Sequence, residues 1–85
     1  MKKLEEYIKD EKNILELEYE FVKDFVSLRK KLHMTQQDVA DNCDVIRETV
    51  ARIESFITSP QIKTMIKILE PMGYTIKIVP VDKTH

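Results

Sequence analysis

The sequence predicts an all-α domain of about five helices, closed by one C-terminal β-strand. Apolar residues recur at intervals of three and four over most of the chain, which is the spacing of one face of an α-helix. One glycine and three prolines in 85 residues are too few for a β-sandwich or a disordered chain. Near the C-terminus the pattern changes to alternation, which is typical of a strand.

The N-terminal third of the chain predicts two helices that are separated at Asn13. The first is a short helix or a frayed arm over residues 1–12, where the apolar residues at helical spacing are Leu4, Tyr7 and Ile8. Asn13 can cap the second helix, with Glu16 completing a capping box. The predicted core face of this longer helix consists of Ile14, Leu17, Phe21, Phe25, Leu28 and Leu32, widened by Leu15, Tyr19, Val22 and Val26.

A shorter helix is predicted to begin after Thr35. The Thr35 hydroxyl can cap it, and Val39 and Ala40 then face inward. The segment Asn42-Cys43-Asp44 ends this helix, because Asn and Asp tolerate the positive φ that a tight turn between helices requires.

Two more short helices complete the predicted bundle. One runs from Ile46 to about Phe56 and buries Val50 and Ile53. The other starts with Ser59 as its cap and Pro60 in its first turn, and it ends at Pro71 and Gly73. Its predicted core face consists of Ile62, Met65, Ile66 and Leu69.

The alternating segment after Gly73 predicts the single strand. Its side chains on one face are Tyr74, Ile76 and Ile78. Because a lone strand cannot satisfy its own backbone, pairing with the same strand of a second copy is the simplest solution. We therefore predict that these three residues form the interface of a homodimer. The alternative is an extended tail that lies on the surface of the domain.

The charges are distributed unevenly along the chain. Fourteen Lys and Arg stand against fifteen Asp and Glu, so the net charge is −1. Residues 1–27 hold eight acids against five lysines, whereas residues 28–85 hold nine bases against seven acids. An acidic N-terminal part joined to a mildly basic C-terminal part predicts two surfaces with different partners. No apolar run is long enough to cross a membrane, and the single Cys43 fits a reducing, cytoplasmic environment.

Catalytic and cofactor motifs are absent from the sequence. Gly73 is the only glycine, which excludes a glycine-rich phosphate loop. His33 and His85 have no Cys or carboxylate cluster at the spacing of metal ligands, and Cys43 has the character of a small core residue. The sequence therefore predicts neither an enzyme nor a bound metal or cofactor.

Residues 28–73 carry a set of short motifs that occur together. They are Leu28-Arg29 before the first short helix, Thr35-Gln36 at its start, Val39-Ala40 inside it, Arg52-Ile53-Glu54 in the next helix, and Ser59-Pro60 after it. This combination resembles the Xre/Cro, lambda-repressor-like helix-turn-helix family. The resemblance implies a DNA-binding domain over 28–73, between an acidic helical extension over 1–27 and a dimerisation strand over 74–81.

In such a family the second helix of the pair lies in the major groove of DNA. The resemblance and the outward positions of that helix predict Arg47, Glu48 and Arg52 as base-reading residues, because Arg can donate two bonds to guanine and Glu can accept from cytosine. The alternative is that they form a solvated, salt-bridged face. The predicted contacts with DNA phosphates are Thr35, Gln36, Thr49 and Lys63. Arg29 and Lys30 are either further contacts with the DNA backbone or ordinary surface residues, and the second interpretation is favoured.

The chain departs from the family pattern at three places. Asp44 replaces the usual Gly of the turn, and Ile46 replaces the usual Ser or Thr cap. The start of the second helix is then either frayed or capped by Asp44. Where the family has a small residue and Gly after the second helix, this chain has Ser55-Phe56-Ile57. Phe56 and Ile57 either complete the core or form an exposed patch that binds a partner.

A long acidic N-terminal helical region precedes the domain, and the segment from Leu69 to Pro80 closes it. Together these features resemble antitoxins of the HigA type. The resemblance implies an antitoxin that neutralises a partner toxin and represses its own operon, and a basic toxin would suit the acidic region around residues 4–24. A dimeric helix-turn-helix protein is expected to bind a palindromic operator in double-stranded DNA. One alternative is that the acidic region only lengthens the core. Another is a protein-interaction module that uses the helix-turn-helix as a scaffold, which the net charge of −1 favours.

Overall fold

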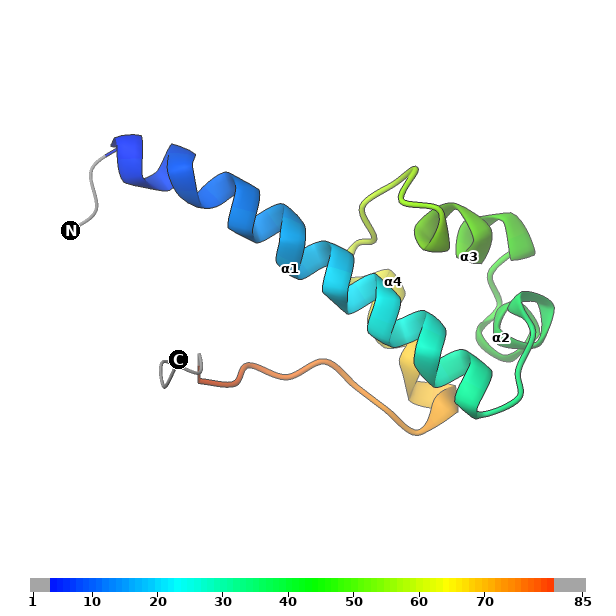
Figure 1. The fold of residues 1–85 in the computed structure, drawn as a ribbon. Helices are drawn as coiled ribbons and strands as arrows, with labels where there is room; N and C mark the ends of the chain where they lie inside the picture. Colours follow the sequence, from blue (N-terminus) through cyan, green and yellow to red (C-terminus); the bar gives the residue numbers. More distant parts are fainter. Residues whose placement is uncertain (1–3, 81–85) are drawn as a thin grey trace.

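The computed structural model describes residues 4–80, with side chains from residue 15 onward, and this part of the chain is all-α. In order, the elements are α1 (Leu4–Lys31), α2 (Gln36–Cys43), α3 (Arg47–Glu54), α4 (Ile62–Leu69) and a 3₁₀ turn, η1 (Glu70–Met72). Figure 1 shows that the C-terminal part of α1 lies beside the other helices, whereas its N-terminal part projects away from them. None of the described helices is both long enough and apolar enough to cross a membrane.

The predicted helix break at Asn13 is wrong, because α1 is a single helix of 28 residues that passes through Asn13 without interruption. Residues 9–12 are Lys-Asp-Glu-Lys, and neither Gly nor Pro occurs nearby to stop a helix that has already formed. The described chain therefore has four α-helices in place of about five. The expected contacts of Leu4, Tyr7, Ile8 and Ile14 lie outside the described side chains.

The core is built from the inner faces of all four helices. Its buried members include the predicted Val39, Ala40, Val50 and Ile53, and α2 packs against both α3 and α4. The other buried apolar residues are Val22, Phe25, Cys43, Met65, Ile68 and Leu69. The thiol of Cys43 donates a hydrogen bond to the Val39 carbonyl over 3.1 Å, and burial raises its pKa. Cys43 is thus a protonated core residue, as its surroundings in the sequence predict.

The predicted core face of α1 is correct only where the helix meets the domain. Val22 and Phe25 are buried, but Leu17 is 64% exposed, and Leu15 and Tyr19 are exposed as well. Leu32 is also exposed, but it lies in the turn after the end of α1 at Lys31. The apolar periodicity continues toward the N-terminus, where α1 has already left the other helices (Figure 1). Periodicity shows that a helix has an apolar face, but it does not show how far the neighbouring helices extend.

The start and the core face of α4 also differ from the prediction. The helix begins at Ile62 after Gln61, so Ser59 and Pro60 belong to the preceding loop. Ile62 is 69% exposed and Ile68 is buried, which rotates the core face relative to the predicted one. Both sets of residues have helical spacing, and packing of α4 against α2 selects the set that contains Met65, Ile68 and Leu69.

Residues 74–80 leave η1 in an extended conformation and run back from α2 and α3 (Figure 1). Among residues 4–80 no strand forms, and within this range no backbone hydrogen bond joins residues 75–79 to other residues. Ile76 is half-buried against the core, whereas Ile78 is 101% exposed. An extended segment without a neighbouring strand cannot form a ladder within one chain, so strand pairing between two copies stays a prediction.

Candidate nucleic-acid interface

The start of α2 is held by a capping box around Thr35. The Thr35 hydroxyl accepts a hydrogen bond from the Asp38 amide over 3.0 Å, and the Thr35 amide donates to the Asp38 carboxylate over 2.8 Å. The amide of Thr35, and next its side chain, lower the pKa of Asp38. The predicted cap is confirmed. Its carboxylate partner is Asp38, three residues into the motif.

A left-handed residue makes the turn between α2 and α3. Asp44 has φ 61° and ψ 39°, and the next amide, that of Val45, bonds back to the Ala40 carbonyl over 3.3 Å. This agrees with the prediction of a positive φ at the Asn42-Cys43-Asp44 turn. Asp44 does not cap α3: Ile46 holds that position in an extended conformation, with no side-chain cap. The first turn of α3 is instead closed by the backbone, where the Thr49 amide donates to the Ile46 carbonyl over 3.0 Å.

Helix α3 has two unlike faces. Val50 and Ile53 are buried, and Thr49 is half-buried. The outward face presents the long polar side chains that the sequence predicts, all of them exposed: Arg47, Glu48 and Arg52. This arrangement leaves two guanidinium groups and one carboxylate available to a ligand along a single short helix.

A buried ion pair fixes α3 against α1. The Arg29 guanidinium bonds Glu54 through two nitrogens, Nε to Oε2 at 2.7 Å and Nη2 to Oε1 at 2.8 Å. Its third nitrogen, Nη1, donates to the Met34 carbonyl over 2.9 Å. The side chains of Arg29 and Glu54 are only 11% and 8% exposed. Such a bidentate pair fixes both distance and orientation.

Treating Arg29 as a surface residue is therefore wrong. It lies four residues after Phe25 and seven after Val22, on the buried face of α1. That position was the available signal: a charged residue in an apolar stripe requires an opposite charge. The partner is Glu54, which the same set of motifs contains, 25 residues further along the chain.

Gln36 joins this network from the first turn of α2. Its Nε2 donates to Glu54 Oε1 over 2.9 Å, so the side chain is half-buried and oriented by α3. The structure thus brings Gln36, which follows the cap residue Thr35, close to the end of α3. Lys63 is exposed on the first turn of α4, beyond the loop that follows α3.

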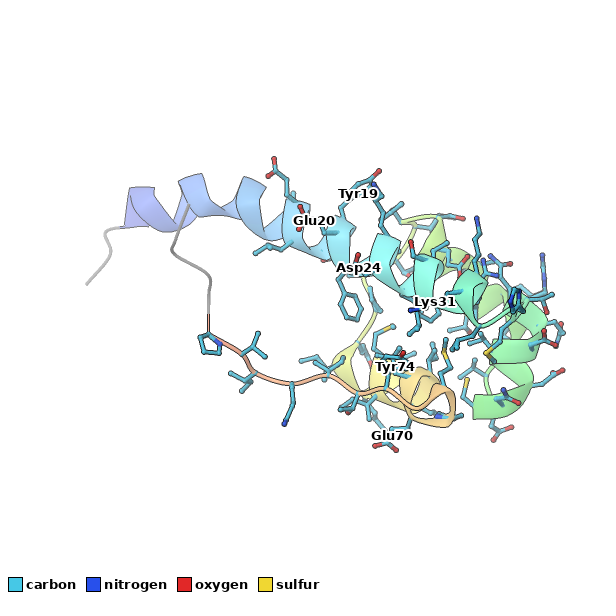
Figure 2. The ribbon with its side chains drawn as sticks, turned by 60° about the horizontal axis from the view of Figure 1, so that its bottom comes forward. Tyr19, Glu20, Asp24, Lys31, Glu70 and Tyr74 are labelled. Carbon is cyan, nitrogen blue, oxygen red and sulfur yellow. The ribbon has the colours of Figure 1, made fainter. Side chains whose placement is uncertain are left out.

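The predicted dimerisation residues lie elsewhere, on the segment that follows η1. Tyr74 is 48% exposed, Ile76 is half-buried and Ile78 is fully exposed. Tyr74 also lines an apolar groove against Phe25 and Leu69. Figure 2 shows Tyr74 on the opposite side of α1 from Tyr19 and Glu20.

Phe56 and Ile57 do not complete the core. They are 47% and 71% exposed in the loop between α3 and α4, so the first of the two alternatives for these residues is wrong. Ile57 extends the exposed apolar surface near the end of α3.

Comparison with known proteins agrees with this geometry. A model of the helix-turn-helix family matches residues 27–79. The chain belongs to the helix-turn-helix family. It is 35% identical over 78 residues to an uncharacterised HTH-type transcriptional regulator of Haemophilus influenzae, covering 89% of this chain and 80% of that protein. No solved structure matches the chain.

Family membership also bears on the class of activity. The helix-turn-helix match and the regulator-type relative agree with the prediction that the protein is not an enzyme. The match begins at residue 27, so it leaves out the first 26 residues, which contain eight of the fifteen acidic residues.

Proposed function

We propose that the protein is a sequence-specific, DNA-binding transcriptional regulator. The observation that carries the proposal is the outward face of α3, where Arg47, Glu48 and Arg52 are exposed while the opposite face is buried. A helix held in this way can enter the major groove and present its side chains to the edges of the bases. Arg47 and Arg52 would read guanine, and Glu48 would accept from the amino group of cytosine.

Phosphate contacts would position α3 in the groove. Thr35 and Gln36 lie at the N-terminus of α2, where backbone N–H groups and the helix dipole favour an anion. Thr49 and the exposed Lys63 complete the proposed set. Because Gln36 is already bonded to Glu54, it would connect a phosphate on one side with α3 on the other. These contacts would set the affinity and its salt dependence, and α3 would set the sequence.

Fluorescence anisotropy with duplex DNA from upstream of the gene tests this function. Replacing Arg47 or Arg52 with Ala should lower the affinity by about 5- to 150-fold each, the value of one good base contact. Lys67→Ala, which removes one exposed charge from α4, is the matched control and should change affinity far less. If the double variant Arg47→Ala, Arg52→Ala binds as tightly as the parent, α3 is not the reading helix.

The regulator would bind as a homodimer to a palindromic operator, with half-sites about one helical turn apart. The support comes from residues 75–79, whose backbone groups make no bonds to other backbone groups within residues 4–80. Pairing this segment with its copy would satisfy those groups and cover Ile78. Tyr74 and Ile76 would flank the pair.

Sedimentation equilibrium tests the dimer. Ile78→Asp should convert the dimer to a monomer without harming the fold, because Ile78 makes no contribution to the core. Val79→Asp is the matched control, since the neighbouring side chain points to the other face of an extended segment. A parent chain that sediments as a monomer, or an Ile78→Asp variant that stays dimeric, would contradict strand pairing through this residue.

We further propose an antitoxin role, in which the acidic part of α1 binds a basic toxin protein. Glu16, Glu20 and Asp24 are exposed at intervals of four, so they share one face of α1. Complementary charge would speed association with a basic partner. The resemblance to HigA-type antitoxins gives the partner class, and autorepression through α3 would follow from the same resemblance.

Co-purification tests this role and separates it from a second candidate function. The small basic protein expected from the adjacent reading frame should co-purify with the parent and be lost with Glu16→Lys plus Glu20→Lys. Lys23→Glu is the control on the same helix and should retain the partner. If the partner is bound while no duplex is bound even at low salt, the protein is an interaction module with a helix-turn-helix scaffold. Exposed Phe56 and Ile57 favour that second candidate.

A further inference from the structure

We propose that Tyr19 of α1 is a positioning residue for α3: it fixes the loop that ends this helix by stacking on Phe56. The proposal rests on the proposed DNA-binding function. It assigns a role in DNA binding to a part of α1 that precedes the helix-turn-helix domain and carries none of the proposed DNA contacts.

The end of α3 has an unusual residue at a constrained position. Phe56 has φ 62°, the left-handed conformation that glycine adopts readily and a bulky side chain disfavours. Its amide bonds the Ile53 carbonyl over 3.1 Å, and the Ile57 amide bonds the Arg52 carbonyl over 3.0 Å. This pair of bonds is the Schellman motif, in which glycine is the usual left-handed residue. Another interaction must therefore stabilise Phe56 in this conformation.

Helix α1 supplies that interaction with two neighbouring residues. The ring of Tyr19 stacks on the ring of Phe56, with centroids 4.8 Å apart and an interplanar angle of 23°. One residue earlier, the Glu18 carboxylate accepts a hydrogen bond of 2.7 Å from the Ser59 hydroxyl. The loop is thus held at Phe56 and again three residues later, and both contacts reach the same turn of α1.

A cation also lies over the ring of Tyr19. The Lys23 ammonium lies 5.4 Å from the centre of the Tyr19 ring, one helical turn further along α1. Tyr19 is therefore held from its own helix while it contacts the loop. In Figure 2 its side chain extends from α1 beside Glu20, on the side away from Tyr74.

The stack acts on α3 through the backbone. The Ile57 amide bonds the carbonyl of Arg52, so the loop conformation fixes the last turn of α3, which carries one of the two proposed base-reading arginines. Without Tyr19, Phe56 keeps the backbone strain and loses the contact that offsets it. The loop then leaves the left-handed conformation more often, and the last turn of α3 frays.

Hydrogen exchange followed by NMR, together with anisotropy on the same operator duplex, tests the proposal. Tyr19→Ala should speed exchange of the Phe56 and Ile57 amides by about two- to tenfold, the value of an aromatic pair, and weaken DNA binding by a similar factor. Tyr19→Phe keeps the ring and should match the parent in both measurements. Leu17→Ala removes another exposed apolar side chain of α1 and is the matched control.

The decisive variant is Tyr19→Ala combined with Phe56→Gly. Glycine holds the left-handed conformation without a stack, so the double variant should recover the slow exchange at residue 57 and the DNA affinity. If Tyr19→Ala leaves exchange and affinity at parental values, or if glycine restores neither, the proposal is wrong. A parent chain that binds no duplex would instead overturn the proposed function, and exchange at Ile57 would still report whether Tyr19 holds the loop.

Discussion

The two ends of this molecule differ in which residues they bury: one end buries a charged residue, and the other exposes apolar residues. At the end formed by α2, α3 and the C-terminal part of α1, the charged Arg29 is only 9% exposed. At the projecting end, formed by the N-terminal part of α1 and residues 77–80, the apolar Leu17 and Ile78 are 64% and 101% exposed. Both ends belong to one short chain, so the difference comes from what surrounds each residue and not from its type.

The comparison shows that available partners decide burial. Arg29 leaves water because Glu54 and the Met34 carbonyl replace its hydrogen bonds. Ile78 stays in water because no described part of the same chain reaches it. At the first end, the buried charge therefore finds its hydrogen-bond partners within one chain. The second end has the exposed Ile78 and backbone groups of residues 75–79 that make no backbone hydrogen bonds within residues 4–80, and the proposed dimer would use both.

Removing the charge of Glu54 should have the largest effect on the first end. Glu54→Gln keeps the shape of the side chain but leaves the Arg29 guanidinium buried without a counter-ion. Loss of one partner of a buried pair costs about 3–5 kcal/mol of unfolding free energy. Urea denaturation followed by circular dichroism measures this loss.

Glu48→Gln is the matched control for that experiment. Glu48 lies on the exposed face of the same helix, so the same chemical change there should alter stability by no more than about 0.5 kcal/mol. Equal stability of the Glu54→Gln and Glu48→Gln variants would mean that the ion pair does not hold α3 in place.

Replacing one isoleucine with alanine at each end should reveal the same contrast in stability, with smaller effects. Ile68→Ala leaves a cavity in the core and should cost about 2–5 kcal/mol. Ile78→Ala should change the stability of the monomer by less than about 0.5 kcal/mol, because the side chain is already in water. Thermal unfolding of both variants, at a concentration where the parent is monomeric, measures the difference. Similar losses would show that Ile78 belongs to the core.

The smallest expected effect concerns the capping box of α2 and its pH dependence. Since hydrogen bonds from Thr35 lower the pKa of Asp38 in the folded chain, the ionised carboxylate stabilises the fold above its ordinary pKa. This contribution is lost as the pH falls through the lowered value. The stability difference between the parent and Asp38→Asn should therefore be greatest near neutral pH and shrink below about pH 4.

Unfolding curves at several pH values measure this difference. Asp41→Asn, which changes another exposed carboxylate of α2, is the control for a general loss of surface charge. A difference between the parent and Asp38→Asn that stays constant down to pH 2 would contradict a role for the ionised Asp38 carboxylate.

Local sequence signals predicted the helix-turn-helix together with its cap and its turn. Thr35 caps the start of α2, Asp44 follows its end with a positive φ, and Val50 and Ile53 are buried on α3. Each of these features depends on residues within a few positions of one another, so short-range propensities predict it. The exposure of Glu48 and Arg52 follows for the same reason, since these two residues are four positions apart and lie on the face opposite Val50 and Ile53. Arg47 is exposed at the first position of the helix.

Features that depend on distant residues were missed or predicted wrongly. The apolar face of α1 extends beyond the helices that cover it, and α4 has two possible apolar faces with the same spacing. The pairing of Arg29 with Glu54 spans 25 residues. Residue spacing along one helix carries no information about which neighbouring helix covers it.

By itself, the sequence determined an all-α, helix-turn-helix domain and the polar face of its α3, because caps, turns and helical periodicity act over a few residues. Only the tertiary structure decided which apolar residues are buried, that Arg29 is among the buried residues, and that Phe56 is stacked on Tyr19. Those outcomes depend on contacts between helices far apart in the chain, where packing and the desolvation of charge outweigh local preference.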